Sequence, residues 1–594
     1  MAEILSKSDK RTHYCGDLRT ADIGSKVCVM GWAGKVRDLG SLIFIDLRDR
    51  SGIIQLAFDE NTDRTVFDKA FKTRTEYVVV AHGTVRKRSS VNNLIPTGDI
   101  EIAVDEYKVL SAAKTSPFEI TDNVNVRDEI ALKYRYLDLR RPSLTKNMIM
   151  RHEIAKAARE YYYENGFIEI ETPMMIKSTP EGARDYLVPS RVHKGSFYAL
   201  PQSPQMYKQI LMIAGFDRYI QLARCFRDED LRADRQPEFT QIDLEMSFVD
   251  QDDVMNMNEG FIAYLYKKVL GIEIPLPLPR LTYEEAMNRF GSDKPDTRFG
   301  MELCDVSDLV KDCGFSVFSG AVANGGSVRA IVAKNAASTL TRKEIDKLTE
   351  HAKGIGAKGL AYIRYVDETP TCSFAKFMAE GELEAIMERI GCERGDVALF
   401  VADKNNIVLS TLGALRLSVA KQLDIIPDKW NFLWITEFPF FEWNEETQNW
   451  DAMQHPFTMP LDECIKDLDN NKGAVRAKAY DLVLNGIELS SGSIRITDPE
   501  LQQKMFTLLG LTEEEIEAKF GFLVDAYNYG APPHGGAGIG LDRLAMLMCG
   551  ADSLRDVVAF PKVQNASELM SGAPTPTDQK ALDDLGIKVV EIEK

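Results

Sequence analysis

Two segments of this 594-residue chain carry residues that suit nucleotide chemistry. In the first, an arginine stands in the acidic run Phe226–Asp230, and a loop separates it from a stretch in which Phe239, Gln241, Asp243 and Glu245 alternate. Alternation at period two places these four side chains on one face of a strand. We expect a hairpin whose face offers a cation, a flat ring and carboxylates, and such a face can hold a nucleotide beside an amino acid. An ordinary polar hairpin is the alternative.

The second segment, Gly535–Leu544, is rich in glycine and runs into an apolar helix. Glycines let a ligand approach the backbone closely, and the start of a helix offers free N–H groups and a positive dipole end. Arg543 adds a cation for a phosphate. The segment contains a GxGxxG-like string. Its spacing does not fit a dinucleotide-binding fold, because no strand–turn–helix unit with an acidic residue about 20 residues on follows it.

Together the two segments resemble motifs 2 and 3 of the class II aminoacyl-tRNA synthetases. Gly166–Pro173 resembles motif 1, the dimer-interface helix and strand that end in proline. The three motifs stand in the order typical of that class, and the chain resembles the bacterial-type aspartyl-tRNA synthetases over nearly its whole length. The resemblance implies an enzyme that joins L-aspartate to ATP and then to tRNA(Asp), working as a homodimer.

The expected fold class is multidomain. Five short strand patterns between residues 14 and 110 predict an OB-fold β-barrel. By resemblance, an α+β class II catalytic domain follows, with an antiparallel sheet flanked by helices, and an inserted α+β domain of the GAD type interrupts it; the sequence assigns this insertion no role. An amphipathic helix is predicted from Leu144 to Asn165, ended by Gly166. The expected boundaries are 1–110 (barrel), 111–143 (linker), 144–290 and 425–555 (catalytic domain), 291–424 (insertion) and 556–594 (C-terminal extension).

The resemblance implies how ATP is held. Arg227 and Arg543 are the expected catalytic residues, binding the α- and γ-phosphates, and Phe239 stacks on the adenine. The remaining residues expected at the ATP site are Asp228, Glu229, Gln236, Glu488, Gly540, Leu541 and Asp542. Asp481 and Glu488 resemble a pair of Mg²⁺ carboxylates, since two oxygen ligands plus phosphates suit that ion. A pair of solvated acids is the alternative.

The same resemblance implies an aspartate pocket. Lys208 and Arg495 clamp the side-chain carboxylate, with Arg495 bidentate. An asparagine amide offers N–H donors to two side chains that are themselves only donors, so the pocket is expected to reject asparagine. The other expected aspartate-binding residues are Glu181, Gln205, Arg227, Asp243 and His455. Gln454 stands where the family commonly has a histidine beside His455, which leaves the role of that histidine open.

In the barrel, the resemblance places Phe44 and Gln55 where anticodon bases are bound, with Arg37 and Leu39 beside them. Enzymes of relaxed specificity, which also charge tRNA(Asn), often carry histidine where Leu39 stands. Leucine offers no hydrogen bond to a base edge, so Leu39 favours an enzyme that charges tRNA(Asp) alone. A non-discriminating enzyme remains the alternative.

Composition agrees with a cytoplasmic globular enzyme. The net charge is −18, yet the first 110 residues are close to neutral, so RNA binding would rest on local basic patches. The chain has no apolar run of about 18 residues that could span a membrane and no signal-peptide pattern at its start. Its nine cysteines are scattered without a CxxC pair, which favours a reducing compartment over a disulfide framework or a zinc site.

Two other classes of function stay open at this point. One is a related enzyme, either an asparaginyl- or lysyl-tRNA synthetase or a tRNA-independent amide ligase. The paired cations argue against asparagine and lysine, and the barrel argues against a ligase that uses no tRNA. The other is a non-catalytic RNA-binding protein on the same scaffold, against which intact Arg227, Arg543 and the two acids argue.

Overall fold

The computed structural model describes residues 3–178, 182–229, 235–446 and 448–590. The described chain divides into two compact units. The first comprises residues 1–150 and 551–576, and the second comprises residues 151–550 and 577–594. Within the described residues, no helix is long and apolar enough to cross a membrane.

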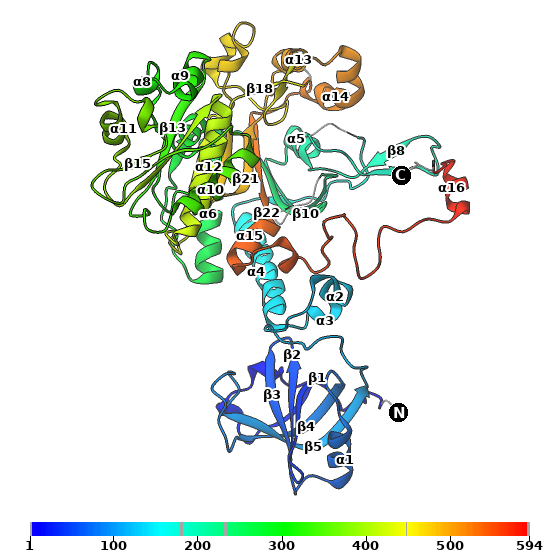
Figure 1. The fold of residues 1–594 in the computed structure, drawn as a ribbon. Coiled ribbons are helices and arrows are strands. Elements are labelled where there is room, and N and C mark those ends of the chain that lie inside the picture. The colour runs from blue at the N-terminus through cyan, green and yellow to red at the C-terminus, as the bar shows by residue number, and fades with distance from the viewer. Residues whose placement is uncertain (1–2, 179–181, 230–234, 447, 591–594) are drawn as a thin grey trace. The chain divides into compact units, whose positions relative to one another are not determined.

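The first unit begins with a closed five-stranded barrel (Figure 1). The strands follow the order β1-β2-β3-β5-β4 around the barrel, and a short helix joins β3 to β4. The elements are β1 (Lys26–Asp38), β2 (Ile43–Asp49), β3 (Gly52–Phe58), α1 (Arg64–Lys72), β4 (Val78–Lys87) and β5 (Ile100–Ser111). Alternate residues along β2 are buried, so one face of each strand lines a common apolar core. The five predicted strands and the OB-fold are confirmed.

Two short helices, α2 (Asp128–Lys133) and α3 (Arg135–Asp138), follow the barrel. Arg135 is buried in α3, pairs with Asp138 at 2.6 Å and donates to the carbonyls of Arg555, Val558 and Ala559. The C-terminal stretch 551–576 is therefore held against the linker. The predicted domain boundaries stay predictions.

The second unit is built on an eight-stranded sheet with the order β11-β17-β20-β21-β22-β10-β9-β6. All its pairings are antiparallel except β11 with β17 and β6 with β9. Its strands are β6 (Ile168–Glu169), β9 (Arg218–Phe226), β10 (Glu238–Ser247), β11 (Arg280–Thr282), β17 (Phe432–Thr436), β20 (Ala479–Leu484), β21 (Ile487–Ile494) and β22 (His534–Gly540). This sheet confirms the predicted antiparallel catalytic fold.

Helices and two small hairpins surround this sheet (Figure 1). The predicted amphipathic helix is present as α4, and Gly166 follows its end with a φ of +79° that favours glycine. The elements are α4 (Pro142–Glu164), α5 (Gln205–Ile213), α6 (Gln251–Leu270), α7 (Tyr283–Phe290), α13 (Pro499–Leu508), α14 (Glu513–Tyr527), α15 (Leu541–Cys549), α16 (Gln579–Leu585), and the hairpins β7 (Leu187–Pro189) with β8 (Phe197–Ala199) and β18 (Phe441–Asn444) with β19 (Asn449–Ala452).

Residues 291–424 form a separate five-stranded sheet with the order β12-β13-β16-β14-β15. Helices α10 and α12 pack on one face of it and α8, α9 and α11 on the other, each side with its own apolar core. Its elements are β12 (Cys304–Asp305), α8 (Ser307–Val310), α9 (Ser316–Ala323), β13 (Ser327–Ala333), α10 (Arg342–Ile355), β14 (Ala361–Arg364), β15 (Thr371–Cys372), α11 (Glu382–Ile390), β16 (Val397–Asp403) and α12 (Asn405–Gln422). Its resemblance to the GAD type stays a prediction.

Candidate active site

The β9–β10 hairpin presents the predicted phosphate and adenine residues together. Glu238 pairs with Phe226 at the loop end of the hairpin, so Arg227, at the start of the connecting loop, lies close to Phe239. The Arg227 guanidinium carbon lies 5.1 Å from the centre of the Phe239 ring. Arg227 Nε is buried without a hydrogen-bond partner among the described residues, which leaves a donor for a ligand.

The flanks of the hairpin carry the next three predicted ATP residues. The Arg184 side chain reaches the Asp228 carboxylate at 3.5 Å, and Glu229 pairs with Arg235 at 3.0 Å. Gln236 is buried where β10 begins. Both acids therefore already have a cation beside them.

Strand β22, which pairs with β10, and helix α15 carry the second group of predicted ATP residues. Gly536 cannot carry a side chain, because a Cβ there would lie 2.1 Å from the Leu244 carbonyl and from a Glu245 carboxylate oxygen. Arg543 follows Gly540 and Leu541 in the first turn of α15 and donates Nη1 to the Glu488 carbonyl at 3.1 Å. The buried Asp542 carboxylate accepts from the Thr240 N–H and pairs with Arg151, so it links α15 to β10 and α4.

A buried cluster of charges lies between α5, β10 and β21. Lys208 contacts Asp243 at 3.1 Å and Glu245 at 3.4 Å. Arg495, just past the end of β21, donates two hydrogen bonds to Glu245, from Nε to Oε1 at 2.9 Å and from Nη2 to Oε2 at 3.0 Å. All four side chains are at most 3% exposed. The Nε and Nη2 edge of Arg495, which was predicted to bind the substrate carboxylate, is thus occupied by Glu245. The second N–H of Arg495 Nη2 and the Lys208 ammonium are left to bind the substrate.

Burial and pairing set the ionisation of this cluster. Burial raises the pKa of Asp243 to about 6, although Lys208 beside it favours the ionised form. Burial also tends to raise the pKa of Glu245, but the charges of Arg495 and Lys208 outweigh this effect and hold its pKa below the ordinary value. Within this cluster, Asp243 rather than Glu245 is therefore the carboxylate that changes charge at a pH of about 6.

His455 completes the cluster as a neutral acceptor. Burial, and then the charges of Arg495 and Lys208, lower its pKa well below the ordinary value. Arg495 donates Nη1 to His455 Nε2 at 2.7 Å, which places the ring proton on Nδ1, 3.3 Å from the Thr458 hydroxyl. A neutral ring can lie beside two cations without adding a third charge.

Gln454, at the position where the family commonly has a second histidine, has a different neighbour. The Ser491 hydroxyl donates to its Oε1 at 3.3 Å, and Ser491 stands opposite Asp481 in the pairing of β20 with β21. Gln454 is thus linked through Ser491 to the predicted metal pair, rather than to Arg495.

Asp481 and Glu488 lie on the two strands of the β20–β21 hairpin. Asn485 and Gly486 both have positive φ, 52° and 83°, as a tight two-residue turn requires. Burial and then the charge of Glu488 raise the pKa of Asp481 well above its ordinary value, and Asp481 Oδ1 has no partner among the described residues. An orphaned carboxylate oxygen beside a second acid fits a cation. No group of three or more His, Cys, Asp or Glu side chains in the described chain forms a metal cluster, so phosphate oxygens and water would complete the ligand set.

Gln205 and Asp243 also keep unused hydrogen-bonding atoms. Gln205 lies one turn before Lys208 on α5, so both face β10. Gln205 Nε2 and Asp243 Oδ1 are buried and have no partner in the described residues. Buried polar atoms are normally satisfied, and their presence here marks a site shaped for a polar ligand. Glu181 lies outside the described residues.

The barrel gathers three of the four predicted anticodon residues. Arg37 donates to Asp46 and to Gln55 Oε1, both at 2.8 Å, and lies over the Phe44 ring at 5.9 Å. Leu39 stands apart on the β1–β2 loop and is 67% exposed. The barrel therefore offers a polar, partly aromatic face beside an apolar loop.

Comparison with known proteins agrees with this geometry. Residues 127–564 match the family model for class II tRNA synthetases (D, K and N), and residues 27–110 match the OB-fold nucleic acid binding domain. The chain belongs to the class II tRNA synthetases. An aspartate–tRNA ligase of Ruminiclostridium cellulolyticum is 58% identical, and the match covers 98% of each chain. An aspartate–tRNA(Asp/Asn) ligase of Caldanaerobacter subterraneus is 56% identical with the same coverage.

Solved class II synthetases share the fold. An asparaginyl-tRNA synthetase from Pyrococcus horikoshii, complexed with asparaginyl-adenylate, has a TM-score of 0.58 at 19% identity and covers 93% of this chain and 98% of its own. A protein described as a putative aspartyl-tRNA synthetase from Leishmania major has a TM-score of 0.60 at 18% identity, covering 94% and 95%. The fold is thus that of this synthetase class.

The sequence analysis missed two members of the synthetase site. Glu245 fell on the predicted face of β10 without a role, and it proves to be the partner of both Arg495 and Lys208. Ser493, two residues before Arg495, accepts from its Nη1. The period-two pattern could have indicated Glu245, since it placed this acid beside Asp243; no local signal indicates Ser493.

Proposed function

We propose that this chain is an aspartate–tRNA ligase. It activates L-aspartate with ATP to form aspartyl-adenylate and pyrophosphate, and it transfers aspartate to the 3′-terminal adenosine of tRNA(Asp). The observation that carries the proposal is the buried pair Lys208 and Arg495 beside a neutral His455, in a class II synthetase. Relatives at 53–58% identity over nearly the whole chain are named aspartate–tRNA ligases or aspartate–tRNA(Asp/Asn) ligases, which supports it.

The amino acid is recognised at its two charged ends. Lys208 and the free Nη2 proton of Arg495 bind the side-chain carboxylate, and Asp243 with Gln205 holds the ammonium group. An asparagine amide would meet donors on every side, because Glu245 is already used by the two cations. Desolvated donors left unpaired reject the wrong substrate strongly.

The reaction needs positioning and charge stabilisation more than covalent chemistry by the protein. The substrate α-carboxylate attacks the α-phosphorus, and pyrophosphate leaves. We assign Arg227 to the α-phosphate and that carboxylate, Phe239 to the adenine and Arg543 to the γ-phosphate. The contact of Arg227 with the Phe239 ring and the position of Arg543 beside Glu488 support these roles. We assign Mg²⁺ to Asp481 and Glu488, where it would neutralise phosphate charge when bound.

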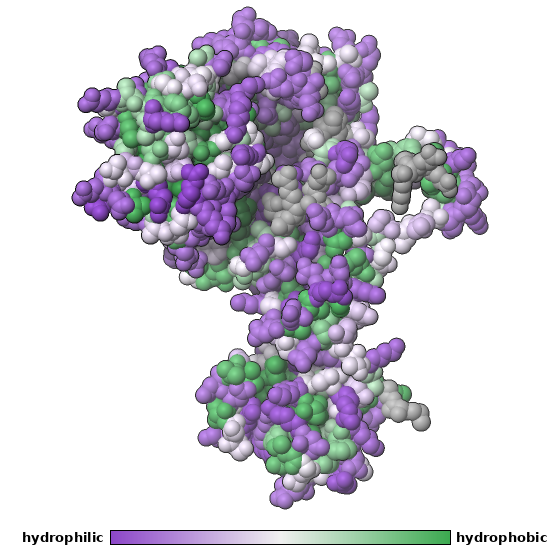
Figure 2. Space-filling view, in the orientation of Figure 1, coloured by the Kyte–Doolittle hydropathy of each residue, from purple (hydrophilic) through white to green (hydrophobic). Residues whose placement is uncertain are grey.

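We further propose a homodimer that forms around motif 1. Tyr163, Ile168 and Met175 are 46%, 49% and 59% exposed, and Leu187 and Val192 of the β7–β8 hairpin are 57% and 73% exposed. Figure 2 shows apolar surface around this hairpin. Exposed apolar surface of this kind marks an interface. Light scattering should give twice the mass of the chain at micromolar concentration; a monomer would contradict the assignment.

The choice of tRNA is a finer proposal. Relatives of both kinds exist, those named for tRNA(Asp/Asn) included. We propose that this chain charges tRNA(Asp) alone, because exposed Leu39 offers no hydrogen bond to a base edge. We also place the reaction in the cytoplasm, a reducing compartment that suits nine free cysteines.

Aminoacylation with labelled amino acids tests the function. Purified tRNA(Asp) should be charged with aspartate and with neither asparagine nor lysine. Charging of tRNA(Asn) at a comparable rate would show a non-discriminating ligase. Binding of tRNA without any charging would support a non-catalytic RNA-binding protein instead.

A further inference from the structure

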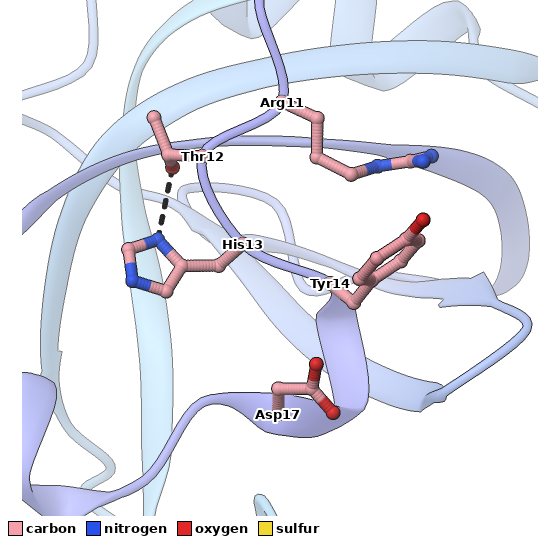
Figure 3. Close-up of a pocket in the computed structure, with 5 residues that line it drawn as sticks. All are labelled: Arg11, Thr12, His13, Tyr14 and Asp17. Carbon is pink, nitrogen blue, oxygen red and sulfur yellow. Dashed lines mark hydrogen bonds between the residues drawn. The ribbon is translucent and has the colours of Figure 1, made fainter.

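The barrel has a second group of cations, away from the expected anticodon residues. A cavity of about 360 Å³ is lined by Arg11, Thr12, His13, Tyr14 and Asp17. Figure 3 shows these five residues. The Gly16 N–H donates to the Ser51 hydroxyl at 2.7 Å, which fixes this segment beside the turn between β2 and β3. The predicted anticodon residue Phe44 lies near the start of β2, and Arg50 lies six residues further on, just after the end of β2, or about 20 Å away. The cavity is thus at the opposite end of β2.

Tyr14 holds two arginines at this cavity. The guanidinium carbons of Arg11 and Arg50 lie 4.7 Å and 4.6 Å from the centre of its ring. Both arginines are exposed, and the attraction of each cation to the ring offsets the repulsion between them. One ring therefore keeps two positive groups close together in defined places.

These cations retain most of their hydrogen-bonding capacity. Arg11 donates one Nη2 proton to the Met30 carbonyl at 3.0 Å. Within the described part of the chain, no carboxylate or carbonyl lies within bonding distance of Arg50, whose contact is the Tyr14 ring. Planar guanidinium groups with free N–H donors match the oxygens of a phosphate.

Asp17 adds an acceptor to the same cavity. Its carboxylate is exposed and has no hydrogen bond or ion pair with any described residue. A carboxylate that lines the same cavity as Arg11 fits a ligand that carries both an anion and a hydroxyl donor. An RNA strand has this combination, since its phosphodiesters are anionic and its ribose 2′-hydroxyls can donate.

We propose that this cavity is a second RNA-backbone site of the barrel. Arg11 and Arg50 bind phosphate oxygens, and Asp17 accepts a hydrogen bond from a ribose hydroxyl. The proposal rests on the proposed function only in taking tRNA as the source of the RNA. A tRNA bound here and at the predicted anticodon residues contacts the barrel at both ends of β2.

Binding of a tRNA transcript to the full-length protein, followed by fluorescence anisotropy over a range of salt concentrations, tests the cations. Arg50→Gln alone, and with Arg11→Gln, should weaken binding, the double variant by about tenfold at 0.1 M salt. The slope of log Kd against log salt should fall by about two for the double variant. Arg64→Gln is the matched control, since Arg64 is another exposed barrel arginine lying over an aromatic ring, Phe67 at 5.5 Å.

The variant Asp17→Ala distinguishes specific RNA binding in this cavity from non-specific attraction of RNA to a positively charged surface. If Asp17 accepts a ribose hydroxyl, the variant binds tRNA more weakly, although it removes a negative charge. If the region acts only through net charge, the variant binds more tightly, and the proposal is overturned. Equal effects of Arg50→Gln and Arg64→Gln would overturn it as well.

Aspartate-dependent ATP–pyrophosphate exchange without tRNA provides the separate check. It should be unchanged in all these variants, which shows that they are folded. Failure of the unaltered protein in this exchange would count against the proposed function, while the binding results would still decide the RNA site.

Discussion

The arginines of the catalytic cluster and those of the barrel cavity have opposite surroundings. Arg495 is 3% exposed, and Glu245, His455 and Ser493 take four of its five N–H donors. Arg11 and Arg50 are exposed and share a tyrosine ring, with no carboxylate partner in the described residues. Removing one partner of a buried ion pair destabilises the protein strongly, because the other charge stays buried without a partner. An exposed cation adds only a small amount to the free energy of binding, and salt reduces that amount.

The largest effect is expected from Arg495→Leu. The change removes a substrate contact and breaks a buried ion pair, and breaking such a pair costs about 3–5 kcal/mol. We therefore expect kcat/KM for aspartate in pyrophosphate exchange to fall by about 10³-fold or more. Arg476→Leu in the same unit is the control, because the Arg476 side chain is 43% exposed and its acid, Glu437, is 3.9 Å away.

Thermal unfolding separates the loss of the substrate contact from the loss of the buried ion pair. Arg495→Leu should unfold at a lower temperature, and Arg495→Leu with Glu245→Leu should recover part of that stability without activity, because no unpaired acid remains. A single variant that keeps activity within tenfold would remove Arg495 from the substrate clamp.

A smaller effect is expected from acid pH. The pKa of Asp243 is about 6, so below this pH its carboxylate becomes neutral and no longer holds the substrate ammonium. We expect kcat/KM for aspartate to fall about tenfold per pH unit below about 6. A flat profile down to pH 5 would contradict the ammonium assignment.

The free energy of unfolding should depend on pH in two opposite directions, one from Asp243 and one from His455. The folded pKa of Asp243 is raised, so its contribution is full below its ordinary pKa near 3.8 and is lost as the pH rises through about 6. The folded pKa of His455 is lowered, so its contribution is present above 6.5 and is lost as the pH falls. Asp243→Asn should remove the first dependence and leave the second, as measured by denaturant unfolding between pH 4 and 7.

On the barrel, Arg37→Gln should weaken tRNA binding by about 1–3 kcal/mol, because Arg37 orients Gln55 and Asp46 and faces the predicted anticodon. Pyrophosphate exchange without tRNA should not change. Equal losses in binding and in exchange would mean that the variant is misfolded rather than impaired at the RNA face.

The smallest effect is expected from Gln454→Ala. Gln454 is connected to the predicted metal pair indirectly, because it accepts from the Ser491 hydroxyl and Ser491 stands opposite Asp481 on the neighbouring strand. We expect the Mg²⁺ concentration for half-maximal exchange to rise less than about tenfold, with KM for aspartate little changed. A rise confined to KM for aspartate would instead place Gln454 in the amino-acid pocket.

Local patterns in the sequence predicted the parts that depend on neighbours along the chain. Alternation predicted the face of β10, and Gly166 predicted the end of α4. These features follow from backbone geometry, which a few adjacent residues determine.

Contacts between distant residues could not be predicted in this way. Glu245 and Arg495 are 250 positions apart, and Arg135 meets the Ala559 carbonyl 424 positions away. By resemblance Asp542 was expected at the ATP site, and its carboxylate accepts from the Thr240 N–H and pairs with Arg151. Only the packing of the sheet decides which charges become partners, and no local pattern encodes it.

Amino-acid specificity in ATP–pyrophosphate exchange tests the central claim most directly. The buried cations Lys208 and Arg495 should accept aspartate and leave asparagine facing donors alone, so kcat/KM for aspartate should exceed that for asparagine by about 10⁴-fold. Lysine should support no exchange. Exchange with asparagine or lysine at a rate equal to that with aspartate would contradict the assignment of the pocket and with it the proposed function.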